Sequence, residues 1–124
     1  MLTDKSALPL AGVRVLDLSR VLAGPWCAMV LGDLGAEVIK VEHPERGDDT
    51  RDWGMRVGST ETAYFNSVNR NKRSVCLDLK TPEGREIARE LIRKSDVVIQ
   101  NFKFGDIERL GLGYDDLKQE QPAL

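Results

Sequence analysis

Four short segments of the sequence carry side chains and backbone that suit the binding of a phosphorylated purine. They are Arg20-Val21-Leu22-Ala23, Glu42-His43, Asp78-Leu79-Lys80 and Asn101-Phe102-Lys103. Together they offer apolar side chains with exposed backbone, an imidazole, an ammonium group, an amide and an aromatic ring. Because charged donors bind phosphate and aromatic rings stack on flat bases, we predict a nucleotide site where these segments meet.

NAD is the competing ligand for such a site. Glu42 follows an apolar run at the place where an acid holds the ribose hydroxyls of a dinucleotide. The preceding turn, however, carries Val21, Leu22 and Ala23 where a dinucleotide fingerprint has its glycines. Side chains at these positions keep a pyrophosphate from approaching the backbone closely, so NAD is the poorer alternative.

The elements that must position these segments follow from hydrophobic periodicity. Residues 13–18 alternate as a short strand, Gly24-Pro25 opens a helix that ends at Gly35, and residues 38–41 form a second strand. Apolar side chains recur in this helix at three- and four-residue steps, which predicts one buried face. Its members are Trp26, Met29, Val30 and Leu34.

A second unit repeats this order along the chain. Residues 75–79 alternate as a strand, and Thr81-Pro82-Glu83 supplies a helix cap, a first-turn proline and a first-turn acid. The helix predicted there has an apolar face made of Ile87, Ala88, Leu91 and Ile92, and a strand at 97–99 follows. Strands separated by such helices pair in parallel with right-handed crossovers. We therefore predict an α/β fold, an open, mostly parallel Rossmann-like sheet with flanking helices.

The connection between the two units is unusually long. It covers residues 43–74, is mostly polar and contains one short helix predicted at 61–68. A connection of this length is usually functional or covered by another part of the protein. Two further short helices are predicted at 106–110 and 114–118, and Pro122-Ala123-Leu124 is typical of the lead into another strand, so we expect a truncated protein.

Composition and charge exclude several classes of protein. The 18 basic and 20 acidic side chains give a net charge of −2, so no overall field favours nucleic acid or an anionic membrane. The first ten residues lack a secretory pattern, and no apolar run is long enough to cross a bilayer. The two cysteines, Cys27 and Cys76, match no metal spacing. We expect a cytoplasmic protein with no metal site, no membrane contact, no nucleic-acid partner and two buried thiols.

Three motifs of the sequence resemble those of a known family. They are RVLAGP, GDLGAEVIKVE and NRNKRS, within a likeness that runs from about Pro9 to Leu117. The chain is similar to the N-terminal domain of the family III CoA-transferases of the CaiB/BaiF type. This resemblance implies that residues 1–124 are the N-terminal part of a large Rossmann-like domain that binds coenzyme A (CoA). It also implies an interlocked homodimer of longer chains.

The resemblance also implies which residues contact CoA. These are Val21, Leu22 and Ala23 beside the pantetheine and adenine end, and His43, Leu77, Lys80, Asn101, Phe102 and Arg109 around the nucleotide. Relatives often have arginine at the position of His43, and a largely neutral imidazole binds phosphate more weakly. Lys80 and Arg109 keep their charge and are the stronger candidates for phosphate.

The activity that the resemblance implies is transfer of CoA between an acyl-CoA and a small carboxylic acid. It implies no permanently bound cofactor, with CoA or acyl-CoA as substrate, and an aspartate that carries the acyl group and then CoA. That aspartate is expected beyond the end of this chain, so we assign no catalytic residue here. Asp17, Asp33 and Asp78 are predicted to be structural hydrogen-bond acceptors. An α-methylacyl-CoA racemase relative and a non-catalytic fragment that binds CoA or a nucleotide are the alternatives.

Three further features of the sequence have two interpretations each. Cys27, in the first turn of a helix, is either a reactive thiol or, as we favour, a packed one. The basic run Arg70, Lys72 and Arg73 either attracts phosphate or coats a loop, and the sequence favours neither. Trp26 either stacks on adenine or packs in the core, and its place on the apolar helix face favours the core.

Overall fold

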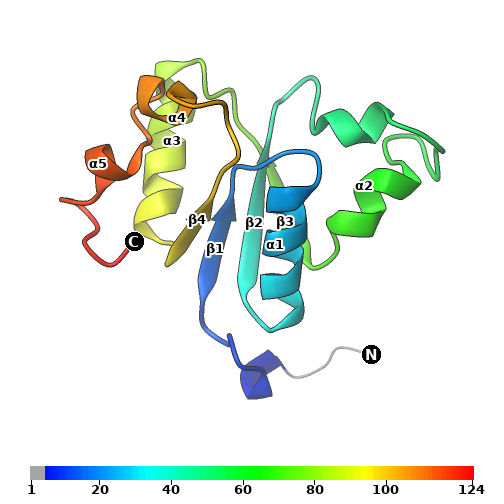
Figure 1. The fold of residues 1–124 in the computed structure, drawn as a ribbon, viewed down its shortest axis with the longest axis horizontal. Helices are drawn as coiled ribbons and strands as arrows, with labels where there is room; N and C mark the ends of the chain where they lie inside the picture. Colours follow the sequence, from blue (N-terminus) through cyan, green and yellow to red (C-terminus); the bar gives the residue numbers. More distant parts are fainter. Residues whose placement is uncertain (1–4) are drawn as a thin grey trace.

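The fold is a four-stranded parallel sheet flanked by helices. The computed structural model describes residues 5–124 and shows the strand order β3-β2-β1-β4, with all neighbouring pairs parallel (Figure 1). The strands are β1 (Arg14–Asp17), β2 (Glu37–Glu42), β3 (Lys72–Cys76) and β4 (Val97–Ile99). The helices are η1 (Lys5–Ala7), α1 (Ala23–Asp33), η2 (Asp49–Asp52), α2 (Ala63–Val68), α3 (Pro82–Arg93), α4 (Asp106–Arg109) and α5 (Tyr114–Leu117). The predicted open parallel α/β sheet is thereby confirmed.

Each face of the sheet has its own core. Val15 and Val38 pack with Ala28 of α1 on one face. On the other face Leu16 packs with Ala88 of α3 in a larger cluster that extends to α4 and α5. Alternation of side chains along each strand sends neighbours to opposite faces, which explains why short strands supply both cores. Figure 1 shows α1 over β3 and beside β2, with α3, α4 and α5 to the left of β4.

Local signals in the sequence fix the helix boundaries where a cap is present. The hydroxyl of Thr81 accepts from the backbone N–H of Gly84 at 3.0 Å and opens α3, as predicted. The hydroxyl of Thr62 accepts from the N–H of Phe65 at 3.1 Å and opens α2 in the same way. In these two places the cap and the following apolar period agree, so the predicted helices are confirmed.

The predicted buried face of α1 is wrong. Met29 is buried, but Trp26, Val30 and Leu34 are 55%, 39% and 41% exposed. The helix instead turns its small residues toward the sheet, with Ala28 at 0% exposure and Gly32 buried as well. A close helix-to-sheet approach needs small side chains, and this requirement outweighs the hydrophobic period. Ile87, placed on the buried face of α3, is likewise 49% exposed.

Two further expectations are corrected by the structure. Cys27 and Cys76 are both free and exposed, so neither is the buried thiol expected from composition. The third strand begins at Lys72 and ends at Cys76, three residues earlier than the alternating pattern predicts. Pairing with β2 explains the shift, because Val38 lies opposite Lys72 and Glu42 lies opposite Cys76. Leu77 and Leu79 therefore follow the strand, in the loop at its carboxyl end.

None of the helices described in residues 5–124 is both long enough and apolar enough to cross a lipid bilayer. In the same part of the chain, no three His, Cys, Asp or Glu side chains are grouped so that they could hold a metal ion.

Candidate functional site

A pocket of about 330 Å³ lies at the carboxyl edge of the sheet. Leu18 and Arg20 reach it from the end of β1, and Val41, Glu42, His43 and Arg46 from the end of β2. The loop after β3 contributes Leu77, Asp78, Leu79 and Lys80. Phe102 after β4 and Asp106, Arg109 and Leu110 of the α4 segment complete the lining. Ligands of open parallel sheets collect at this edge, so the pocket is the leading candidate for a binding site.

The structure brings five of the nine residues assigned to CoA into this one pocket. They are His43, Leu77, Lys80, Phe102 and Arg109. Asn101 is exposed and does not line the pocket; its side-chain amide donates to the backbone carbonyl of Arg20 at 2.7 Å and accepts from the Arg20 N–H at 2.9 Å. Asn101 thus fixes the β1 loop beside the pocket. Val21, Leu22 and Ala23 continue this loop into α1 and do not line the pocket.

The pocket carries more positive than negative charge that is free to act on a ligand. Among the described residues, no ion pair is recorded for Arg20, Arg46 or Lys80. Of the acids in the lining, Glu42 is paired with Arg51 and Asp106 with Arg109. Asp78 accepts from the backbone N–H of Lys80 at 2.9 Å. The local field therefore favours an anion although the chain as a whole is slightly acidic.

An aromatic ring closes one side of the pocket. The guanidinium carbon of Arg20 lies 5.6 Å from the ring centroid of Phe102, a cation–π contact between the β1 and β4 loops. Together with the side chains of Leu77 and Leu79, this ring gives the pocket an apolar part beside its basic rim. Such a combination fits a ligand with both a flat base and phosphate groups.

Two lysines with buried side chains hold the β1 loop that borders the site; the sequence analysis missed Lys40 and considered Lys72 only as part of a basic run. Lys40 is 1% exposed and its Nζ lies 2.9 Å from a carboxylate oxygen of Asp48 and 2.9 Å from the carbonyl oxygen of Ser19. The Nζ of Lys72 lies 2.9 Å from Asp17 and donates to the carbonyl of Pro25 at 2.9 Å. Lys40 of β2 and Lys72 of β3 thus both hold the segment that leads from β1 into α1.

The Asp48 carboxylate also supports an unusual backbone conformation. It accepts from the N–H of Val21 at 3.3 Å, and Val21 has a φ of 73°. A β-branched residue rarely adopts a positive φ, so other contacts must stabilise it there. Asp48 is itself fixed by the backbone N–H and hydroxyl of Thr50 at 3.0 and 2.7 Å. A Lys in the apolar strand EVIKVE and an Asp two residues before a Thr are the sequence signals that could have indicated this arrangement.

Glu42 is occupied by protein groups. Arg51 reaches its two carboxylate oxygens at 2.7 and 2.8 Å, and the hydroxyl of Ser74 donates at 2.8 Å. The backbone N–H of Asp48 adds a further bond at 3.0 Å. An acid held in this way has little capacity left for ribose hydroxyls, which weakens the argument for NAD. The described residues leave no buried side-chain nitrogen or oxygen without a partner.

The acids named as structural in the sequence analysis do act as hydrogen-bond acceptors. Asp17 accepts from the backbone N–H of Ser19 at 2.9 Å, and Asp33 accepts from Arg70 and Asn71. Within the basic run, Arg70 pairs with Asp33, Lys72 with Asp17 and Arg73 with Glu37. None of these three cations lines the pocket described above. Arg70 and Arg73 are therefore surface side chains, in line with the second interpretation, whereas Lys72 is buried in an ion pair and fits neither interpretation.

Acid should destabilise the fold through this network. Burial alone would raise the pKa of Glu42, but hydrogen bonds from Arg51 and Ser74 outweigh it and lower the pKa below its ordinary 4.5. Asp48 behaves in the same way. Burial would raise its pKa, but the positive charge of Lys40 and the hydrogen bonds from Thr50 outweigh burial and lower the pKa below its ordinary 3.8.

The pKa values of Glu42 and Asp48 are lower in the folded than in the unfolded protein. The two carboxylates therefore contribute their full stabilisation above the unfolded-state pKa values, and this stabilisation is lost as the pH falls through the folded-state pKa values. We expect the urea midpoint to fall steadily between about pH 4.5 and pH 2, with little change from pH 7 to 5. A midpoint that stays level or rises on acidification would contradict this assignment.

The fold and the pocket define an open α/β domain of doubly wound type, with the strand order of the first four strands of a Rossmann sheet and a basic pocket at its carboxyl edge. Comparison with known sequences is more specific. The sequence model described as CoA-transferase family III matches residues 10–124, and the chain belongs to this family.

Three CoA-transferases are similar to this chain over most of its length. The chain is 54% identical over 119 residues to succinyl-CoA:glutarate CoA-transferase of Mus musculus, covering 96% of this chain and 27% of the relative. It is 52% identical over 122 residues to succinate–glutarate CoA-transferase of Agrobacterium fabrum, covering 94% of this chain and 30% of the relative. Formyl-CoA:oxalate CoA-transferase of Bradyrhizobium diazoefficiens is 43% identical, over 93% of this chain and 27% of the relative. The chain thus spans less than a third of the length of these proteins.

Solved structures agree with the fold. A CAIB/BAIF family protein from Brucella suis superposes with a TM-score of 0.84 at 52% identity, over 90% of this chain and 30% of that one. Rv3272 from Mycobacterium tuberculosis superposes with a TM-score of 0.86 at 43% identity, over 95% of this chain and 33% of that one. The sheet and its helices therefore have the arrangement found in this family.

Proposed function

We propose that this chain is the CoA-binding part of an acyl-CoA:carboxylate CoA-transferase, with residues 1–124 forming the N-terminal part of the large domain. The observation that carries the proposal is the pocket at the carboxyl edge of the sheet. It combines unpaired cations, among them Lys80 and Arg20, with the ring of Phe102 and an apolar wall. The nucleotide part of CoA offers phosphates and a flat base to such a pocket.

The reaction proposed for the whole protein proceeds through an aspartyl carboxylate. The carboxylate attacks the thioester carbonyl, forms an anhydride with the acyl group and releases the CoA thiolate. The thiolate then attacks the aspartyl carbonyl of the anhydride, giving an aspartyl thioester and the free acid. The incoming acid repeats these steps in reverse and leaves as its CoA thioester.

The three buried acids nearest the pocket are poorly suited to act as that nucleophile. Asp17, Glu42 and Asp48 are buried and already bound by lysine or arginine side chains. A carboxylate held in such ion pairs is a weak nucleophile, because attack would break the pairs. In line with the family resemblance, we propose that the reacting aspartate comes from another part of the protein, and that the whole protein is a cytoplasmic homodimer.

Succinyl-CoA with dicarboxylic acids is the first substrate pair to assay. The named relatives of mouse and Agrobacterium fabrum support glutarate as acceptor, at 54% and 52% identity. The full-length protein should transfer CoA from succinyl-CoA to glutarate. Chromatographic separation of succinyl-CoA from glutaryl-CoA measures the transfer. The 124-residue chain alone should show no turnover. Racemisation of a 2-methylacyl-CoA in place of transfer would support the racemase alternative instead.

Lys80→Ala should weaken binding of CoA by about 1–3 kcal/mol, because a charged hydrogen bond to phosphate is lost. The measurement is calorimetric titration of the chain with CoA at moderate salt. Lys94→Ala is the matched control, since Lys94 is an exposed lysine at the end of α3 that does not line the pocket. Equal affinities for all three proteins would remove Lys80 from the site.

A further inference from the structure

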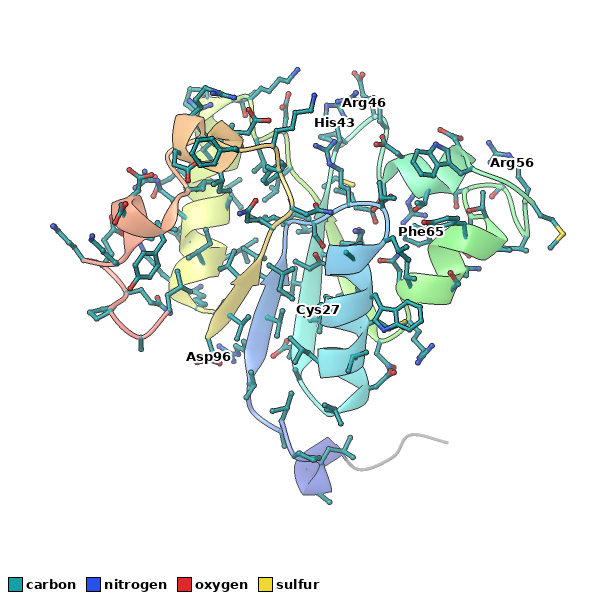
Figure 2. The ribbon with its side chains drawn as sticks, in the orientation of Figure 1. Cys27, His43, Arg46, Arg56, Phe65 and Asp96 are labelled. Carbon is teal, nitrogen blue, oxygen red and sulfur yellow. The ribbon has the colours of Figure 1, made fainter. Side chains whose placement is uncertain are left out.

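We propose that Arg46 binds a phosphate group of the CoA nucleotide and supplies the positive charge that His43 does not. The inference deepens the proposed function and rests on it. Arg46 lines the pocket at the carboxyl edge of the sheet and also the neighbouring groove beside Arg51 and Arg56. Figure 2 shows His43 and Arg46 close together above the end of β2.

The ring of His43 is used by the backbone of its own turn. Its Nδ1 lies 3.1 Å from the backbone nitrogen of Glu45 and 3.3 Å from that of Arg46, and both N–H groups donate to it. An imidazole nitrogen that accepts two N–H bonds holds a lone pair and no proton. His43 can therefore offer a ligand one neutral Nε2–H donor, a weaker partner for a phosphate dianion than a cation.

The turn that carries Arg46 is held in one conformation. The N–H of Gly47 donates to the carbonyl of His43 at 2.9 Å and closes the turn. Gly47 has a φ of +61°, and an added Cβ would lie 2.8 Å from the Glu42 carboxylate and from the Arg51 side chain. The next residue, Asp48, belongs to the buried pair with Lys40. The Cα of Arg46 is thus fixed beside the pocket, and its long side chain alone remains to be ordered by a ligand.

Arg46 differs from Arg51, Arg56 and Arg109 in having no ion-pair partner among the described residues. Arg51 pairs with Glu42, Arg56 with Asp52 and Arg109 with Asp106. The exposed guanidinium of Arg46 makes no ion pair or side-chain hydrogen bond with any residue from 5 to 124. Binding of phosphate by Arg46 breaks no existing pair, whereas Arg109 would have to share or leave Asp106. A fork of guanidinium donors also matches two phosphate oxygens at once.

The test compares CoA with 3′-dephospho-CoA by calorimetric titration of four proteins. These are the unaltered chain, Arg46→Gln, Arg46→Lys and the control Lys94→Gln, which removes one charge away from the pocket. Arg46→Gln should weaken CoA binding about tenfold, as expected for loss of a charged hydrogen bond, and Arg46→Lys should restore part of the affinity. Lys94→Gln should bind as the unaltered chain does.

The two ligands identify the phosphate. A loss at Arg46→Gln seen with CoA and absent with 3′-dephospho-CoA assigns Arg46 to the 3′-phosphate; an equal loss with both assigns it to the diphosphate. Either outcome supports the inference. If the unaltered chain binds CoA and Arg46→Gln binds it equally well, Arg46 has no such role and the proposed function stands. If the unaltered chain does not bind CoA, the proposed function itself is contradicted.

Discussion

Asp48→Ala should lower the free energy of unfolding by about 3–5 kcal/mol, because it leaves the ammonium of Lys40 buried without its carboxylate. Lys40 and Asp48 side chains are 1% and 0% exposed, so water cannot replace the lost partner without opening the core. The N–H of Val21 loses its acceptor at the same time. The free energy of unfolding of a domain of this size is only about 5–15 kcal/mol, so the substitution would remove a large part of it. Urea unfolding followed by circular dichroism at pH 7 measures the change.

Two variants control this prediction. Asp33→Ala removes an ion pair with Arg70, whose side chain is 58% exposed, and should change stability by no more than about 1 kcal/mol. Adding Lys40→Met to Asp48→Ala should recover part of the loss, because no unpaired charge then remains in the core. A loss below about 1 kcal/mol for Asp48→Ala would show that the buried pair does not support the fold as described.

Gly84→Ala should destabilise the chain by about 2 kcal/mol or more, as expected for overpacking against backbone. An added Cβ would lie 2.0 Å from the carbonyl oxygen of Asp78 and 2.7 Å from its carbon. Either α3 must move away from the sheet or the loop of residues 78–80 must shift. That loop lines the pocket, so affinity for CoA should fall together with stability.

Gly58→Ala is the control for this substitution. A Cβ at Gly58 meets nothing within 4 Å, and no positive φ is recorded for it. Its effect should lie within about 0.5 kcal/mol, as for most surface changes. If Gly84→Ala unfolds at the same urea concentration as Gly58→Ala, the close packing of α3 against the 78–80 loop is not as the structure has it.

Much of the fold could be predicted because local signals agreed with one another. The Thr81 cap, the following proline and the apolar period all indicate one helix, and α3 is found there. The face of α1 could not be predicted in this way. Trp26 and its apolar neighbours satisfy a helical period, but the sheet accepts Ala28 and Gly32 because the helix approaches it closely. The small residues that face the sheet, Gly24, Ala28 and Gly32, do recur at four-residue steps, but a search for large apolar side chains passes over them.

The sequence predicted which loops meet at the candidate site, but it did not predict the buried ion pair that holds one of these loops in place. Loops at the ends of parallel strands must meet, so the convergence of His43, Lys80 and Phe102 follows from the order of strands alone. The pairing of Lys40 with Asp48 joins a strand to a loop whose path the sequence does not define. Nothing in the sequence distinguishes Arg46 from its paired neighbours either. Only the assembled turn shows which cations have partners.

The most direct test of the central claim, that CoA binds at the carboxyl edge of the sheet, is an amide NMR titration of the chain with CoA. The amides of Leu18, His43 and the 77–80 loop should shift together and saturate with one affinity. NAD at equal concentration should shift them less. Shifts confined to the groove between β4 and α5, around Val97 and Tyr114, or no shifts at millimolar CoA, would contradict the claim.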